Sequence, residues 1–198
     1  MFSGIIEQVS SVRSVRKHGR LLRVRFRKPA RWRLAKGQSV SVDGICTTVI
    51  GSGKDWFDAD YMPETLSKTT AASFLEGRAV NLERALTFGA HVNGHFVQGH
   101  VEGVAAVVGV ADEGKSRRLT LRLPKPLMRY VATKGSIALD GVSLTVARAG
   151  ALVEVALIPF TLAHTTLKGL AAGDFVNVET DMFAGYAKRT ARGKVRGT

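Results

Sequence analysis

Five side chains in this sequence have groups that could act on a ligand, namely Cys46, Thr48, His100, Ser143 and Thr145. His100 is the leading candidate for proton transfer, because a neutral imidazole titrates near working pH and general acid–base assistance is worth roughly 10²- to 10⁴-fold in rate. Ser143 and Thr145 are two residues apart, so a strand places both hydroxyls on one face, where they can donate to a carbonyl or hold a water. Cys46 and Thr48 form the same arrangement with a thiol in the first position. The competing interpretation is structural: a histidine bonded to backbone, ordinary strand hydroxyls and a cysteine packed as a small core residue.

These residues lie at equivalent positions of an internal repeat. The segment 36–49 returns, one residue shorter, as 134–146, and the segment 62–70 returns as 158–166. The offset stays between about 95 and 98 residues along the chain. Because self-similarity at a fixed period is the signature of repeated structural units, we predict two copies of one unit.

The two copies differ where reacting groups would be expected. Equivalent positions hold different residues in four cases, which pair Ile5 with His100, Cys46 with Ser143, Glu64 with Phe160 and Lys68 with His164. Two pockets with different roles would diverge at the reacting groups and keep the scaffold, and this pattern fits that expectation. His164 is interpreted as structural, and His91 and His95 lie near the connection between the copies.

Both copies have the pattern of β structure. Apolar residues alternate with arginines along residues 22–27, the period of a strand with one buried face. Asp43-Gly44 and Asp140-Gly141 each separate two short β-branched runs, a strong hairpin signal because glycine adopts positive φ without strain. Helical character is confined to residues 65–75 and 161–170, where Thr65 and Thr161 are expected to be the helix caps.

We therefore predict an all-β chain with two tandem, similar, six-stranded Greek-key barrels, each with one short helix. The predicted boundaries are residues 1–90 for the first barrel, 91–185 for the second and 186–198 for a short basic tail. Gly89, Asn93 and Gly94 interrupt the pattern between the two barrels.

Composition sets limits on the class of protein. Of 198 residues 45% are hydrophobic, which excludes a disordered chain. The beginning of the sequence lacks the pattern of a secretory signal, and a single cysteine cannot form an internal disulfide, so we expect a cytoplasmic protein without a membrane partner.

The formal charge of +13 would by itself suggest a nucleic-acid partner. However, the positive charge is local: residues 1–36 hold eleven Lys or Arg against one acid, and residues 187–198 hold five more. In the first segment the basic residues alternate with core residues, and only Phe26 and Trp32 lie among them, so no series of stacking aromatics is present. We expect no nucleic-acid partner.

The motifs of both copies resemble riboflavin synthases of the α-chain type. They comprise residues 1–7 (Met-Phe-Ser-Gly-Ile-Ile-Glu), 43–46, 64–66, 80–85, 93–101 (Asn-Gly-His-Phe-Val-Gln-Gly-His-Val), 134–146 and 157–167. The resemblance extends from Met1 to about Asp181. It implies paired barrels, a homotrimer whose active site lies between the first barrel of one subunit and the second barrel of the next, and possible association with lumazine synthase.

The resemblance also implies a transferase reaction that needs neither a metal nor an external cofactor. Two molecules of 6,7-dimethyl-8-ribityllumazine would dismutate to riboflavin and 5-amino-6-(D-ribitylamino)uracil, the last step of riboflavin biosynthesis. Two nearly identical ligands require two nearly identical pockets that face each other, which accounts for the repeat. The alternative is a non-catalytic lumazine- or flavin-binding protein of the antenna type, against which the retention of Cys46, His100, Ser143 and Thr145 counts.

Substrate contacts implied by the resemblance fall on matching positions of both copies. They are Gly4, Ile5, Ile6, Cys46, Thr47, Thr48, Asp60, Tyr61, Met62, Pro63, Glu64, Thr65, Gly99, His100, Val101, Lys134, Ser143, Leu144, Thr145, Leu157, Ile158, Pro159, Phe160, Thr161 and Leu162. Asp60 and Glu64 are expected to accept hydrogen bonds from ribityl hydroxyls.

The sequence departs from the family pattern at three places. Ser3 replaces a threonine, and Phe160 stands where a histidine or glutamate is common, so we expect altered binding strength in the second pocket. The segment after Asp181 contains Gly185, Gly193 and Gly197, which predicts a poor helix and a trimer contact made by a shorter segment.

Overall fold

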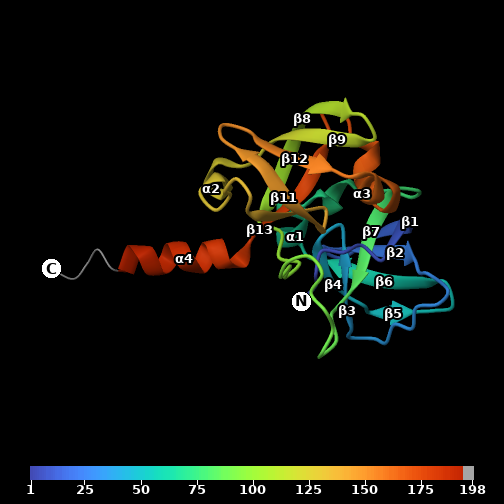
Figure 1. Ribbon diagram of the computed structural model, residues 1–198. Coiled ribbons are helices and arrows are strands. Elements are labelled where there is room, and N and C mark those ends of the chain that lie inside the picture. Colours follow the sequence, from blue (N-terminus) through green and yellow to red (C-terminus); the bar gives the residue numbers. More distant parts are fainter. Residues whose placement is uncertain (194–198) are drawn as a thin grey trace.

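The computed structural model describes residues 1–193 and consists of two antiparallel β units, one below the other in Figure 1. The first unit contains β1 (Gln8–His18), β2 (Leu21–Arg27), β3 (Ser39–Val42), β4 (Ile45–Thr48), β5 (Gly51–Ser52), β6 (Trp56–Tyr61) and β7 (Ala79–Arg84). The second contains β8 (Gly103–Glu113), β9 (Ser116–Arg122), β10 (Ser136–Leu139), β11 (Val142–Ala149), β12 (Val153–Leu157) and β13 (Phe175–Thr180). The prediction of an all-β chain with two similar units is confirmed.

The two units differ in how their sheets close. The second is a closed six-stranded barrel in the order β10-β11-β12-β9-β8-β13, whereas the first is a seven-stranded sheet in the order β4-β3-β7-β1-β2-β6-β5. In the barrel, β11 is continuous and pairs with both β10 and β12. Its counterpart is divided into β4 and β5, and the Ile50 N–H between them donates to the Asp58 carbonyl at 2.9 Å. The divided strand is therefore still hydrogen-bonded to β6 through Ile50, although the first sheet is open.

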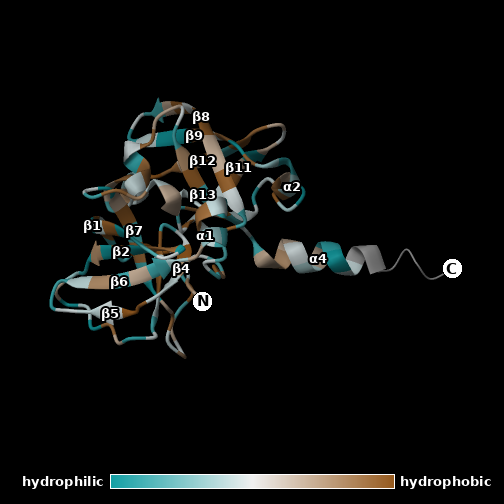
Figure 2. Cartoon of the chain, turned by 180° about the vertical axis from the view of Figure 1, so that it is seen from behind, coloured by the Kyte–Doolittle hydropathy of each residue, from teal (hydrophilic) through white to brown (hydrophobic). Residues whose placement is uncertain are grey.

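Each unit has its own apolar core. On β2, Val24 and Phe26 are fully buried, and the alternating Arg23, Arg25 and Arg27 point outward, as the alternation predicts. In the first core Phe26 stacks on Phe57 at a centroid distance of 5.1 Å. Brown, apolar strands in the interior of both units are visible from behind in Figure 2. Burial of one strand face thus keeps the other face free for polar groups.

Both Asp-Gly turns are present, and they pack against each other between the units. The φ angles are +46° and +79° at Asp43 and Gly44, and +44° and +78° at Asp140 and Gly141. Two successive positive φ angles define the tight hairpin turn that these dipeptides predict. A Cβ on Gly44 would lie 2.7 Å from the backbone nitrogen of Gly141, so the close approach of the turns requires glycine.

Two buried asparagines cross-link the units with pseudo-twofold symmetry. The Asn81 side chain donates to the Asp140 carbonyl at 3.0 Å, and the Asn177 side chain donates to the Asp43 carbonyl at 2.8 Å. Within each unit the aspartate accepts from the asparagine backbone N–H at 2.7 Å. Burial raises the pKa of Asp43 to about 7 and raises that of Asp140 well above its usual range, with the Asp43 charge adding to the second shift.

The connecting helices begin earlier than predicted and are interrupted. They are α1 (Pro63–Lys68), followed by a 3₁₀ turn at Thr70–Ser73, and α3 (Pro159–His164), followed by a 3₁₀ turn at Thr166–Gly169; α2 (Lys125–Met128) is one further short turn. The expectation that Thr65 and Thr161 cap these helices is wrong, because proline begins each helix and the preceding residue makes no side-chain cap. Instead, the Thr69 and Thr165 hydroxyls cap the 3₁₀ turns.

The segment after Asp181 forms the helix α4 (Met182–Gly193), which projects away from the body (Figure 1). The prediction of a poor helix around Gly185 is therefore wrong. A glycine costs only about 1 kcal/mol in a helix, and the Asp181 carboxylate accepts from the Phe183 N–H at 2.9 Å, which caps the start. Gly197 and the rest of residues 194–198 of the predicted tail lie outside the described residues. Within residues 1–193, no helix is long and apolar enough to cross a membrane.

Candidate functional site

The beginning of the chain bridges the two units beside β11. Glu83 on β7 accepts hydrogen bonds from the Ser3 and Gly4 N–H groups at 2.7 and 3.0 Å. The Gly4 carbonyl then accepts from the Ser143 N–H on β11 at 2.8 Å. The start of the first unit is therefore an edge of the second unit's candidate site.

The segment 98–100 makes the reciprocal bridge beside β4. Glu179 on β13 accepts from the Gln98, Gly99 and His100 N–H groups at 2.6 to 2.9 Å. The Gly99 carbonyl accepts from the Cys46 N–H on β4 at 2.8 Å. Burial raises the pKa of Glu179, an effect that the three N–H donors oppose.

On β4, the predicted residues divide between the two faces of the strand. The Thr47 hydroxyl lies inside the unit, 3.1 Å from the Tyr61 hydroxyl, where burial strongly raises the pKa of that tyrosine. Cys46 is half-buried and Thr48 is exposed on the opposite, outer face. Any ligand on this outer face meets Cys46 and Thr48 by side chain and can meet Thr47 only by backbone.

β11 and β12 repeat this division in the second unit. Ser143 is half-buried and Thr145 exposed on the outer face, while Leu144 and Leu157 are buried and face the core. Ile158 and Phe160 follow on the outside, and both are exposed. The second outer face thus has two hydroxyls on β11 and two exposed apolar side chains at its margin.

Ser143 has a partner that the comparison of the two copies could not find. His95 Nδ1 lies 2.7 Å from Ser143 Oγ, and burial lowers the pKa of this histidine. An offset of 95 residues would place the counterpart of His95 before Met1, so no pair existed to compare. In the sequence His95 stands only within the motif at residues 93–101, and the structure shows how closely this segment approaches β11: a Cβ on Gly94 would lie 2.8 Å from Ser143 Oγ.

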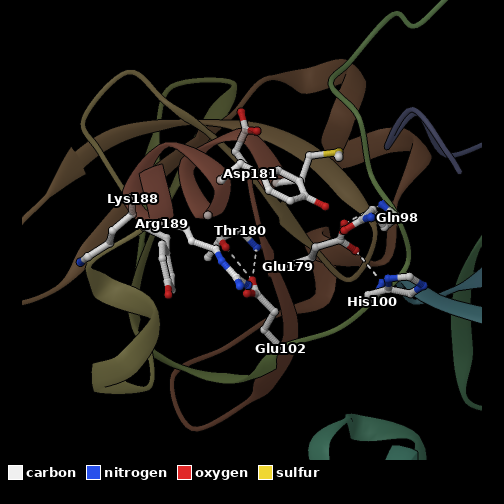
Figure 3. Close-up of a pocket in the computed structure, with 12 residues that line it drawn as sticks. Gln98, His100, Glu102, Glu179, Thr180, Asp181, Lys188 and Arg189 are labelled. Carbon is white, nitrogen blue, oxygen red and sulfur yellow. Dashed lines mark hydrogen bonds between the residues drawn. The ribbon is translucent and has the colours of Figure 1, made fainter. Parts of the chain in front are cut away.

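The His100 imidazole is exposed at a cavity of about 550 Å³ (Figure 3). Glu179 accepts a hydrogen bond from the His100 backbone N–H, and α4 contributes Tyr186, Lys188 and Arg189 to the lining, with Lys188 and Arg189 on the side away from His100 (Figure 3). Except for His100, the sequence did not single out these lining residues, because a cavity between a loop and a projecting helix leaves no local pattern. His100 is therefore free to approach a ligand and is not satisfied as a structural histidine.

The two carboxylates expected to contact ribityl hydroxyls are already ion-paired. Asp60 makes two 2.8 Å bonds with the Arg23 guanidinium, which lowers the pKa of Asp60. Glu64 is exposed and bonds Lys68 at 2.7 Å along α1. Both carboxylates keep further lone pairs that can accept hydrogen bonds.

The remaining predicted contacts surround these two faces. Those with exposed side chains are Ile5, Met62, Pro63, Lys134 and Pro159, those half-buried are Ile6, Thr65, Val101, Thr161 and Leu162, and Gly4 and Gly99 are buried. Gly4, Ile5, Ser143 and Thr145 are associated with the second face, whereas Cys46, Thr48, Gly99 and His100 are associated with the first. The structure therefore gathers the predicted residues into two candidate half-sites, one on each unit.

Comparison with known proteins gives the same division of the chain. The family model of the lumazine binding domain matches residues 3–85 and 98–181. A protein named riboflavin synthase from Brucella abortus (strain 2308) is 42% identical over 97% of this chain and 98% of its own length. Another of that name, from Bacillus subtilis (strain 168), is 36% identical over 96% of this chain and 89% of its own.

Among solved structures, LumP complexed with riboflavin superimposes with a TM-score of 0.84 at 25% identity, covering 91% of this chain and 99% of that one. The chain therefore belongs to the riboflavin synthase family and contains two tandem lumazine binding domains.

Proposed function

We propose that this protein is a riboflavin synthase that dismutates two molecules of 6,7-dimethyl-8-ribityllumazine to riboflavin and 5-amino-6-(D-ribitylamino)uracil. The observation that carries this proposal is the pair of half-sites built on one plan. In each, a strand pairs a hydroxyl or thiol with a threonine, Cys46 with Thr48 and Ser143 with Thr145, beside a glycine carbonyl of a bridging segment. Two similar ligands require such a pair, and the difference between the first residues suits unequal roles.

The groups present can perform the proton transfers that this reaction requires. His95 Nδ1 lies 2.7 Å from Ser143 Oγ and burial favours its neutral form, so it can accept the Ser143 hydroxyl proton and Ser143 or a water beside it can add to the ligand ring. His100, exposed on the other unit, can remove or return a proton at the ligand's methyl group. The lumazine ring itself delocalises the resulting carbanion, so we propose no metal and no cofactor.

We further propose that catalysis takes place between subunits of a homotrimer. The two half-sites lie on outer faces, and a second copy is required to bring a first-unit face opposite a second-unit face. On α4, Phe183 packs edge-on against Phe96 at 5.9 Å yet remains 57% exposed, which leaves apolar surface for a neighbouring subunit. Association with lumazine synthase and a cytoplasmic location stay predictions.

The likeness to LumP favours one competing function, in which the protein binds lumazine or flavin without catalysis. A turnover assay separates the two functions. Purified protein incubated with 6,7-dimethyl-8-ribityllumazine should release riboflavin at half the molar amount of lumazine consumed. Binding with a change in fluorescence but no riboflavin would favour the non-catalytic function, and consumption at another ratio would contradict dismutation.

A further inference from the structure

One ion pair stands on the outer face of the first unit and has no counterpart on the second. Arg23 on β2 and Asp60 on β6 are directly opposed in the antiparallel register. The guanidinium Nε and Nη2 atoms donate to the two carboxylate oxygens, each at 2.8 Å. This bidentate geometry fixes the plane of the carboxylate as well as its position.

The carboxylate lies on the same face as the candidate ligand groups. Ala59 and Tyr61 on either side of Asp60 are buried, so Asp60 points outward. The Tyr61 hydroxyl meets the Thr47 hydroxyl inside the unit, which places β6 beside β4. Because side chains alternate along both strands, Asp60 shares the outer face with Thr48.

The equivalent pair is absent from the second unit. Arg118 on β9, at the position of Arg23, is opposed by Ala156 on β12. Arg118 bonds instead to Glu113 at 2.6 Å, at the far end of the β8–β9 hairpin. Glu154 on β12 does lie 3.6 Å from Arg118, but it is opposed by Thr120 in the register. Within the described residues, only the first half-site therefore has a carboxylate held at 2.8 Å by both donors of the arginine directly opposite it.

We infer that Arg23 is a positioning residue, which holds the Asp60 carboxylate to accept hydrogen bonds from the polyhydroxyl chain of a ligand on the first unit. This inference rests on the proposed function, since it takes the ligand to be a ribityl-substituted ring. With its plane fixed by Arg23, the carboxylate keeps lone pairs directed away from the guanidinium and toward the open face. Without Arg23, the carboxylate would have to be ordered when the ligand binds, and binding would weaken.

The chain offers a matched control in the next pair along the same two strands. Arg25 and Asp58 are also opposed, and their bonds measure 2.7 and 2.8 Å. Arg25 also stacks over Trp56 at 3.8 Å, and Asp58 pairs with β5 rather than with β4. Loss of this pair removes the same kind of interaction from the same sheet and changes no residue of the first half-site.

The test compares two flavins that differ only in the side chain. Riboflavin has the ribityl chain, and lumiflavin has a methyl group in its place. Fluorescence titration of the full chain should show that Arg23→Gln weakens riboflavin binding about tenfold and lumiflavin binding by less than twofold. Arg25→Gln should change neither constant by more than twofold. Arg23→Lys should restore only part of the loss, because lysine cannot bind both oxygens in a fixed plane.

A second variant keeps the test decisive if Arg23→Gln fails to fold. Asp60→Asn retains the shape of the side chain and should give the same riboflavin-specific loss. Equal losses for both flavins, or equal losses in the Arg23 and Arg25 variants, would overturn the inference while leaving the proposed function intact. If the unmodified protein bound neither flavin and formed no riboflavin, the proposed function would itself be wrong.

Discussion

His95 Nδ1 lies 2.7 Å from Ser143 Oγ, and the other ring nitrogen of His95 is buried without a hydrogen-bond partner in the described part of the chain. This contact joins the connection between the two units to the strand that carries the second half-site. It gives Ser143 a base that Cys46, its counterpart, lacks within residues 1–193. The two candidate half-sites therefore differ in the groups available for proton transfer as well as in the residue at the position of Ser143 and Cys46.

The His95–Ser143 contact predicts that both residues are required for turnover. Ser143→Ala and His95→Gln should each lower kcat roughly 10²-fold or more, and the double variant should be little worse than either, because the two groups act together. Cys46→Ser should retain most of the activity, since a hydroxyl can make the contacts proposed for the thiol. The measurement is the rate of riboflavin formation by each of the four variants at a saturating concentration of lumazine. Fully additive losses in the double variant would show that the residues act separately, and inactive Cys46→Ser would point to a nucleophilic thiol.

The buried Asp43–Asp140 pair predicts that stability falls as pH rises. The folded-state pKa of Asp43, about 7, lies above its ordinary value of 3.8, so the folded protein holds a proton that the unfolded chain releases. Stability contributed by this proton is complete below about pH 4 and is lost as pH rises to about 7, a change of up to about 4 kcal/mol. Urea unfolding between pH 4 and pH 8 should show this decline.

Asp43→Asn should flatten that decline, because the amide keeps an oxygen for the Asn81 N–H and cannot ionise. The exposed Asp112→Asn should leave the pH dependence unchanged. A pH dependence identical in Asp43→Asn and the unmodified protein would assign the decline to other groups, such as Asp140, Glu83 and Glu179, whose pKa values burial also raises.

The contact between the two Asp-Gly turns predicts a large cost for one added methyl group. Gly44→Ala places a Cβ 2.7 Å from the Gly141 backbone, whereas Gly77→Ala, at a similar φ of +86°, has no heavy atom within 4 Å. Gly77→Ala should therefore cost only the strain of positive φ, about 1–2 kcal/mol. Gly44→Ala should cost about 1–3 kcal/mol more, because two backbones must separate. Chemical denaturation of both variants at one pH gives the two free energies of unfolding. Equal losses of stability in the two variants would mean that the turns can separate at little cost.

The exposed apolar surface of α4 predicts that this helix is required for assembly. Phe183→Ser should shift the mass in solution from trimer toward monomer and reduce turnover with it. The control is Phe175→Ser, which removes a comparably exposed phenylalanine (60%) from β13. Light scattering after size exclusion measures the mass, and a Phe183→Ser protein that remains a fully active trimer would exclude α4 from the contact.

Several features followed from the sequence because they depend on local rules. Alternation along residues 22–27 and the Asp-Gly dipeptides specify strands and turns through side-chain burial and backbone sterics alone. The repeat then related Cys46 to Ser143 and Ile5 to His100, because similar sequence folds to similar local structure. In the same way, two residues of separation were enough to place Ser143 and Thr145 on one face.

Other features depended on contacts between segments far apart in the chain, which no local pattern records. The buried turn at Asp43 and the His95–Ser143 contact arise only when the two units pack together. The helix α4 was missed because propensity penalised Gly185 while the cap at Asp181 compensated for it. The sequence by itself therefore determined the two units and identified most of the polar residues of the candidate site. Only the tertiary structure decided which of these residues contact each other, because burial and desolvation depend on how separate elements pack and not on the order of residues along one element.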